Sequence, residues 1–171
     1  MVTATTQIQM NTLKTGAGLN YPVVMKAPFD YTEYIIQVEV KTDDVIAIGD
    51  IAAIELGGLL VVSTSTATVP VIVLDTAYNK MILEGHGLTV SKAAQFKDGD
   101  KIDCLILVPG LILSMKVEAG ADVIIGQKLL ADATAGQLTG GVTAGAVVGI
   151  ALSELDWTDG TNVFYCAVLI K

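Results

Sequence analysis

The chain contains no arginine, because every one of its ten basic residues is a lysine. These lysines face 18 acidic residues, which gives a formal net charge of −8. Recognition of nucleic acids depends on basic patches and arginine forks, and anionic membrane surfaces also attract basic segments. The composition therefore predicts neither a nucleic acid nor a membrane as a partner.

Histidine is almost as scarce, since the chain has only His86, which lies between two glycines. One imidazole is too few for histidine-based metal sites, and no G-x-S-x-G nucleophile elbow or phosphate-binding glycine loop occurs. We expect His86 to be an exposed loop residue without a catalytic role. The sequence predicts no enzyme, no catalytic residue and no cofactor.

The segment from Asp98 to Asp103 is the densest cluster of carboxylates that a hard cation would favour. It holds Asp98, Asp100 and Asp103 within six residues. An EF-hand loop requires alternating oxygen ligands, a glycine at its sixth position and a closing glutamate at its twelfth. The segment lacks that order, so we expect a solvated hairpin turn and no metal.

The two cysteines, Cys104 and Cys166, each lie in an apolar, strand-like run. Buried free thiols are the first interpretation, as is usual in a reducing compartment. A bridge between facing strands and a reactive or metal-binding thiol are the alternatives.

Charged residues make up only 16% of the 171 residues and hydrophobic residues 52%, with a mean hydropathy of +0.61. Such a chain is too apolar for intrinsic disorder, and its length suits one domain or two small lobes. The densest apolar run, 105–113, is interrupted by Pro109 and Gly110, which argues against a membrane helix. The N-terminus shows no secretory signal, so we expect synthesis in the cytosol. The apolar excess predicts a partner or an oligomer.

Short β-branched runs separated by glycine and aspartate turns dominate the sequence from Tyr21 onwards. This spacing predicts an all-β fold, a compact sandwich or barrel of short antiparallel strands. The one helix that we expect is short and covers Ser91–Phe96, whereas 75–80 is expected to be a turn and 81–83 a strand. The predicted organisation is an N-terminal arm (1–20), a β domain that is possibly a first lobe (21–110), and C-terminal β-hairpins (111–171).

Two segments of the chain echo each other. Residues 44–51 and 122–129 both contain a β-branched run, a glycine turn and the start of a second strand. A duplication would explain this similarity, and so would two independent hairpins with the same turn chemistry.

The C-terminal third resembles two kinds of protein. Its strand–turn–strand around Gly126 is similar to biotinyl and lipoyl carrier domains, but no lysine has the flanking residues and hairpin tip that such a carrier needs. Residues 118–139, the V-G-x-A strand at 148–154 and the final strand more closely resemble the small capsid decoration (cement) proteins of tailed phages. Similarity is looser at 34–56, and residues 59–108 have no counterpart.

This resemblance implies a non-enzymatic virion protein, made in the host cytoplasm, that stabilises the outer capsid surface by bridging major capsid subunits. Its implied partners are the major capsid protein and further copies of itself, with a homotrimer favoured. Another tail, spike or surface-array module is the alternative.

Several apolar side chains are candidates for contact with such partners. The arm is either ordered by contact with a neighbour or a frayed end, and its candidate residues are Ile8, Met10 and Leu13. Trp157, in a polar loop, and the aromatic cluster near the arm either anchor an interface or cap the core. That cluster consists of Tyr21, Phe29 and Tyr31.

Deletion of residues 1–18 is expected to leave a folded domain and to weaken capsid attachment or subunit exchange. Circular dichroism and capsid co-sedimentation measure the two effects. An unfolded deletion variant would show that the arm belongs to the core, and unchanged capsid binding would show that it is a frayed end.

Overall fold

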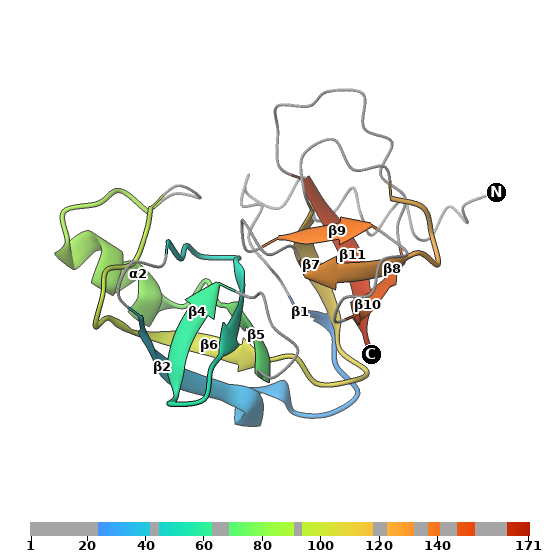
Figure 1. Ribbon diagram of the computed structural model, residues 1–171, viewed down its shortest axis with the longest axis horizontal. Helices are drawn as coiled ribbons and strands as arrows, with labels where there is room; N and C mark the ends of the chain where they lie inside the picture. Colours follow the sequence, from blue (N-terminus) through green and yellow to red (C-terminus); the bar gives the residue numbers. More distant parts are fainter. Residues whose placement is uncertain are drawn as a thin grey trace.

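The computed structural model describes residues 24–41, 45–62, 69–90, 94–117, 123–131, 137–140, 147–152 and 164–171. These residues form two five-stranded β-barrels that lie side by side, together with one further strand and one α-helix (Figure 1). The prediction of a compact all-β sandwich or barrel is confirmed, and the structure is of the barrel kind. The predicted arm, residues 1–20, lies outside the described residues.

The first barrel closes in the order β2-β4-β3-β5-β6. Strands β2 and β4 pair in parallel, and the other four pairings are antiparallel. The strands are β2 (Ile35–Val40), β3 (Ile51–Ile54), β4 (Leu59–Val62), β5 (Val69–Val73) and β6 (Lys101–Ile106).

Alternation along β2 explains how the sequence forms this barrel. Val38 and Val40 are buried inside it, whereas Gln37 and Glu39 point outwards and are exposed. A strand places successive side chains on opposite faces, so this pattern fixes which face lines the interior.

The second barrel contains the remaining strands apart from β1, in the ring order β7-β9-β8-β10-β11. It is closed by a parallel pairing of Val117 in β7 with Leu138 in β9. A short strand, β1, adds to the edge of β7, so the segment before the first barrel contacts the second. The strands are β1 (Val24–Lys26), β7 (Ile112–Val117), β8 (Lys128–Ala131), β9 (Leu138–Gly140), β10 (Val147–Ala151) and β11 (Phe164–Ile170).

The two barrels have the same topology. In chain order, β2 to β6 correspond to β7 to β11, with the same neighbours and with the parallel pair between the first and third strands of each barrel. The register agrees as well, because Val40 pairs with Leu60 in one barrel and Val117 with Leu138 in the other. The similarity seen in the sequence thus extends to whole barrels, which favours a duplication over two independent hairpins.

The turn before the second strand of each barrel is the most similar part of the repeat. Gly49 and Gly126 have φ angles of 90° and 89°, a conformation that glycine adopts without strain. Their N–H groups donate to equivalent carbonyls, those of Val73 and Ala151, at 3.0 and 2.8 Å. The shared glycine turn of the two sequence segments therefore has one structural role.

The connection between the fourth and fifth strands is longer in the first barrel (74–100) than in the second (152–163). In the first barrel it contains α2 (Ala77–Gly85), which begins at the N-cap Thr76, whose side chain accepts from Asn79 N–H. The expectation of a turn and a strand at 75–83 is therefore wrong, because the cap and the buried Leu83 favour a helix. A short 3-10 helix, η1 (Tyr31–Tyr34), precedes β2.

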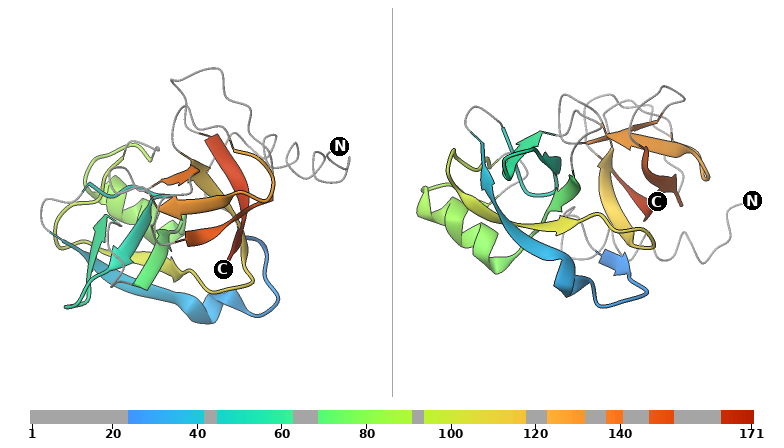
Figure 2. Two further views of the ribbon diagram at one scale, coloured as in Figure 1. Left: turned by 45° about the vertical axis from the view of Figure 1, so that its right-hand side comes forward. Right: turned by 60° about the horizontal axis from the view of Figure 1, so that its bottom comes forward.

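The expected helix at Ser91–Phe96 is also wrong for its described part. Gln95 forms an isolated antiparallel bridge with Ala47, and Ala94 and Phe96 on either side of it are buried. This extended segment and α2 both pack against the core of the first barrel. The right-hand view of Figure 2 shows α2 on the side of that barrel that faces away from the second.

The core has two parts. One fills the first barrel, and the other runs from the outer face of the first barrel into the interior of the second. In the second part, Ile51, Ile72 and Leu105 point outwards from the first barrel and are fully buried. Fully burying such side chains stabilises by about 1.5–3 kcal/mol each, so the contact between the barrels is a substantial part of the folded state.

Gly149 in β10 occupies a position where a side chain has no room. A Cβ there would meet the carbonyl oxygen of Leu169 and the side chain of Val168. Gly149→Ala is expected to lower the free energy of unfolding by about 1–3 kcal/mol, because the neighbours that clash belong to a buried strand. Urea denaturation measures the change.

The matched control is Gly85→Ala at the end of α2, where a Cβ meets nothing within 4 Å. It should leave stability unchanged or raise it by up to about 1 kcal/mol, since alanine has the higher helix propensity. Equal effects of the two substitutions would contradict the steric argument.

Candidate functional site

The two thiols are sealed inside the barrels. Cys104 lies within the first barrel and Cys166 within the second, both fully buried and not joined in a disulfide, which confirms the first interpretation. Burial, together with the charge of Asp103, raises the pKa of Cys104 to about 12. A thiol in this state has little thiolate to offer for catalysis or metal binding.

His86 does not behave as the exposed loop residue that the sequence suggested. It is half-buried at the C-terminal end of α2, and its Nε2 lies 2.9 and 3.0 Å from the two carboxylate oxygens of Asp100. Asp100 also accepts from Lys97 N–H at 2.7 Å. The pair therefore ties the end of the helix to the turn before β6.

A second polar cluster holds the start of α2. Asn79 is fully buried, and its side-chain N–H groups donate to the carbonyls of Leu74 and Asp103, while its Oδ1 accepts from Asp103 N–H. The Asp103 carboxylate in turn accepts from Thr76 Oγ1 at 2.8 Å. Asp100 and Asp103 thus position the helix, and the described residues contain no group of three side chains suited to a metal ion.

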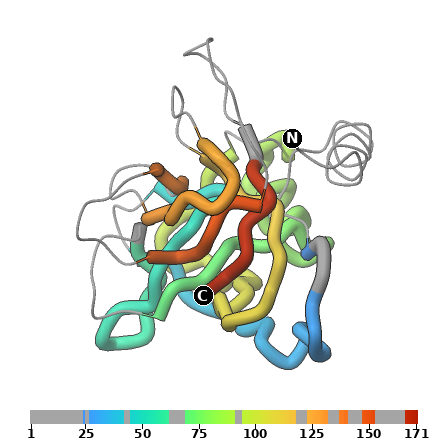
Figure 3. Tube along the Cα trace, turned by 90° about the vertical axis from the view of Figure 1, so that its right-hand side faces the viewer, coloured from blue at the N-terminus to red at the C-terminus, as the bar shows by residue number. Residues whose placement is uncertain are grey.

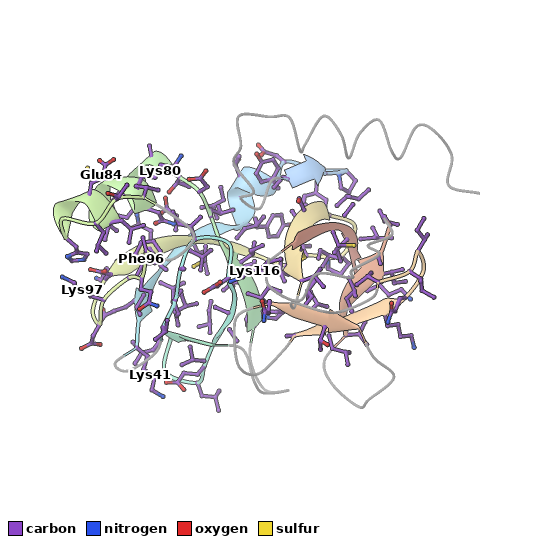
Figure 4. The ribbon with its side chains drawn as sticks, turned by 90° about the horizontal axis from the view of Figure 1, so that it is seen from above. Lys41, Lys80, Glu84, Phe96, Lys97 and Lys116 are labelled. Atoms are coloured by element: carbon purple, nitrogen blue, oxygen red, sulfur yellow. The ribbon has the colours of Figure 1, made fainter. Side chains whose placement is uncertain are left out.

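The third polar contact joins the two barrels. Lys116 of β7 donates to Asp50 Oδ1 at 2.9 Å, and the other carboxylate oxygen accepts from Ala47 N–H at 2.9 Å. Figure 4 shows Lys116 between the barrels. Burial raises the pKa of Asp50 above its usual range, although Lys116 and the Ala47 N–H favour the charged form.

The described surface carries several large apolar side chains that are exposed. On the second barrel, Ile124 and Ile125 are 63% and 48% exposed, whereas their counterparts on the first barrel, Ala47 and Ile48, are 6% and 2% exposed. Large exposed apolar side chains also occur elsewhere, namely Val45, Leu56, Val69, Tyr78, Met81, Leu88 and Val147. Clustered exposed apolar side chains are typical of interaction surfaces.

Ile124 and Ile125 are not among the contact residues that the sequence predicts, because they lie in a β-branched run that resembles a strand. The structure instead shows an isolated bridge at Val123 and then the turn of Gly126. Their position within the repeat could have identified them. The segment that covers the equivalent positions in the first barrel lies in an insertion that also contains the α-helix.

The candidate contact residues have different outcomes. Ile8, Met10, Leu13, Tyr21 and Trp157 lie outside the described residues. Phe29 and Tyr31 are half-buried and pack against the larger core, and the Phe29 ring contacts Tyr34 edge-on at 5.3 Å between centroids. The structure does not bring these two side chains together with Ile124 and Ile125 in one cluster of the core.

The described part of the chain has no helix of the length and hydropathy that crossing a membrane requires.

Comparisons with known proteins return matches among solved structures. No protein-family model and no curated protein matches the chain. Among solved structures, the crystal structure of the head fiber gp8.5 N base of bacteriophage phi29 has a TM-score of 0.41 and 11% identity. The similarity covers 80% of this chain and 94% of that chain. At these values it gives no basis for transferring a function.

Lys116→Met is expected to lower the free energy of unfolding at pH 7 by about 3 kcal/mol, because it leaves the Asp50 charge buried without its partner. The folded-state pKa of Asp50 lies above the unfolded value of 3.8, so the folded state binds more protons between the two values, and stability falls as pH rises through this window. Removing Lys116 raises that pKa further. The destabilisation should therefore be smaller at pH 4 than at pH 7 in urea denaturation.

Two controls accompany this measurement. Asp50→Asn combined with Lys116→Met should recover most of the loss, because no buried charge remains. Lys41→Met removes the partly exposed pair with Glu55 and should cost less than about 1 kcal/mol. A loss for Lys116→Met that does not change with pH would contradict the role of the Asp50 charge.

Proposed function

We propose that the chain is a non-enzymatic structural protein of a tailed-phage virion, which binds the outer capsid surface and stabilises it by bridging major capsid subunits. One observation carries the proposal. The partly buried polar clusters described above serve to hold the barrels and the helix together, while large apolar side chains remain exposed. Such a surface is suited to adhesion.

The sequence resemblance to decoration proteins coincides with the barrel that carries Ile124 and Ile125. The matching segments include β8, β9, β10 and β11. Ile124 and Ile125 lie in the matching segment 118–139, at the turn that leads into β8. The second barrel is therefore the part that we assign to capsid contact.

On a capsid lattice, where contacts are repeated, each individual contact can be weak. A chain that contacts two neighbouring subunits gains effective concentration for its second contact once the first has formed. Burial of a few isoleucine side chains in each contact is then sufficient for stable attachment. The net charge of −8 keeps the free protein soluble before it attaches.

Ile124→Ser combined with Ile125→Ser is expected to weaken attachment to capsids at least about tenfold, since two apolar side chains lose their burial. Co-sedimentation with capsids prepared without this chain measures the affinity. Because both side chains are exposed in the free protein, the variant should keep its stability.

Leu56→Ser combined with Met81→Ser is the matched control. It removes two exposed apolar side chains from the first barrel and α2, and it should leave attachment unchanged. The proposal fails if the unmodified protein does not sediment with capsids. Equal loss in both double variants would show that the second barrel is not the contact.

A further inference from the structure

The contact between the barrels joins two different surfaces. The first barrel contributes an outward row, Ile51, Ile72 and Leu105, whose members are neighbours across β3, β5 and β6. This row is fully buried, and beside it Asp50 pairs with Lys116 of β7. The row belongs to the core cluster that continues into the second barrel, and we refer to it as the docking row. We refer to the outer side of β7, which carries Lys116 and the buried Ser114, as its acceptor.

The second barrel has its own counterpart of the docking row. Strand register places Lys128, Ile150 and Leu169 at the equivalent positions, since Lys128 pairs with Ile150 and Ile150 with Leu169. Lys128 is exposed, and the other two side chains are only half-buried. Strands β10 and β11 lie toward the viewer in Figure 3, on the side away from the first barrel.

The first barrel, in turn, has a counterpart of the acceptor. Register places Glu39 of β2 where β7 has Lys116, and Gln37 where β7 has Ser114. Ser114 is buried, whereas Gln37 and Glu39 are both exposed. Within the part of the chain that the structure describes, each barrel thus has one of the two surfaces that is not packed against the other barrel.

The polar groups on the two unused surfaces are complementary. In the turn of the second barrel, Gln127 replaces Asp50, and its Oε1 accepts from Ile124 N–H at 3.1 Å, as Asp50 Oδ2 does from Ala47 N–H. This leaves the Gln127 amide N–H groups as donors where Asp50 offers an acceptor. The acceptor Glu39 replaces the donor Lys116, and the adjacent Lys128 supplies the opposite charge.

From this match we propose that the second barrel of one copy docks on the first barrel of another, with Ile150 and Leu169 against β2 and with Lys128 and Gln127 facing Glu39. The contact repeats the relation between the barrels within one chain. It is heterologous, so successive copies form a closed ring or an open row. This self-association goes beyond capsid attachment and does not depend on it.

Charge reversal tests the pairing directly. The full chain should associate with rising concentration in sedimentation velocity at low salt. Lys128→Glu and Glu39→Lys should each lower the association constant about fivefold, because like charges then meet at the contact. An equimolar mixture of the two variants should restore association, since each reversed surface then finds its complement on the other variant.

Lys97→Glu is the matched control, because Lys97 is exposed and lies outside both surfaces. It should associate like the unmodified protein. A monomer at all concentrations would overturn the proposal, and so would two weakened variants whose mixture stays weak. If such a monomer still binds capsids, the inference fails while the proposed function stands.

Discussion

The burial of one apolar row between two barrels is the constraint on which the rest of this molecule depends. Ile51, Ile72 and Leu105 point away from the interior of their own barrel, and they are buried in a core cluster that continues into the second barrel. The second barrel also brings Lys116 to the buried Asp50 carboxylate. Neither barrel presents the same surface alone as it does in the chain, so the two act as one structural unit.

The repeat explains both what the barrels share and what distinguishes them. The glycine turn, the ring order and the parallel closing pair are common to both. The first barrel adds α2 and the extended segment around Phe96, which cover its end, and the polar residues Thr76, Asn79 and His86 hold this addition in place. The imidazole of His86 and the carboxylates of Asp100 and Asp103 are therefore used to attach an insertion.

The sequence predicted the class of fold because its strands alternate and its turns contain glycine and aspartate. It also predicted the burial of both cysteines from the apolar runs around them. The helix at Ala77–Gly85 was missed because the sequence around it resembles that of a strand. In addition, its N-cap Thr76 contacts Asp103 of β6, which is distant in the chain. The exposed Ile124 and Ile125 were missed for a related reason, since exposure depends on which barrel carries the covering segment. The trimer, the capsid partner and the roles of Ile8, Met10, Leu13, Tyr21 and Trp157 stay predictions.

The short strand β1 has a consequence for the integrity of the molecule. Residues 24–26 pair with β7 of the second barrel, although the chain then continues into β2 of the first. The polypeptide therefore passes between the barrels twice, once before β2 and once between Leu107 and Leu111. A protease that cut only the second crossing would leave both fragments tethered, so breakage of a single peptide bond there would not release half of the protein.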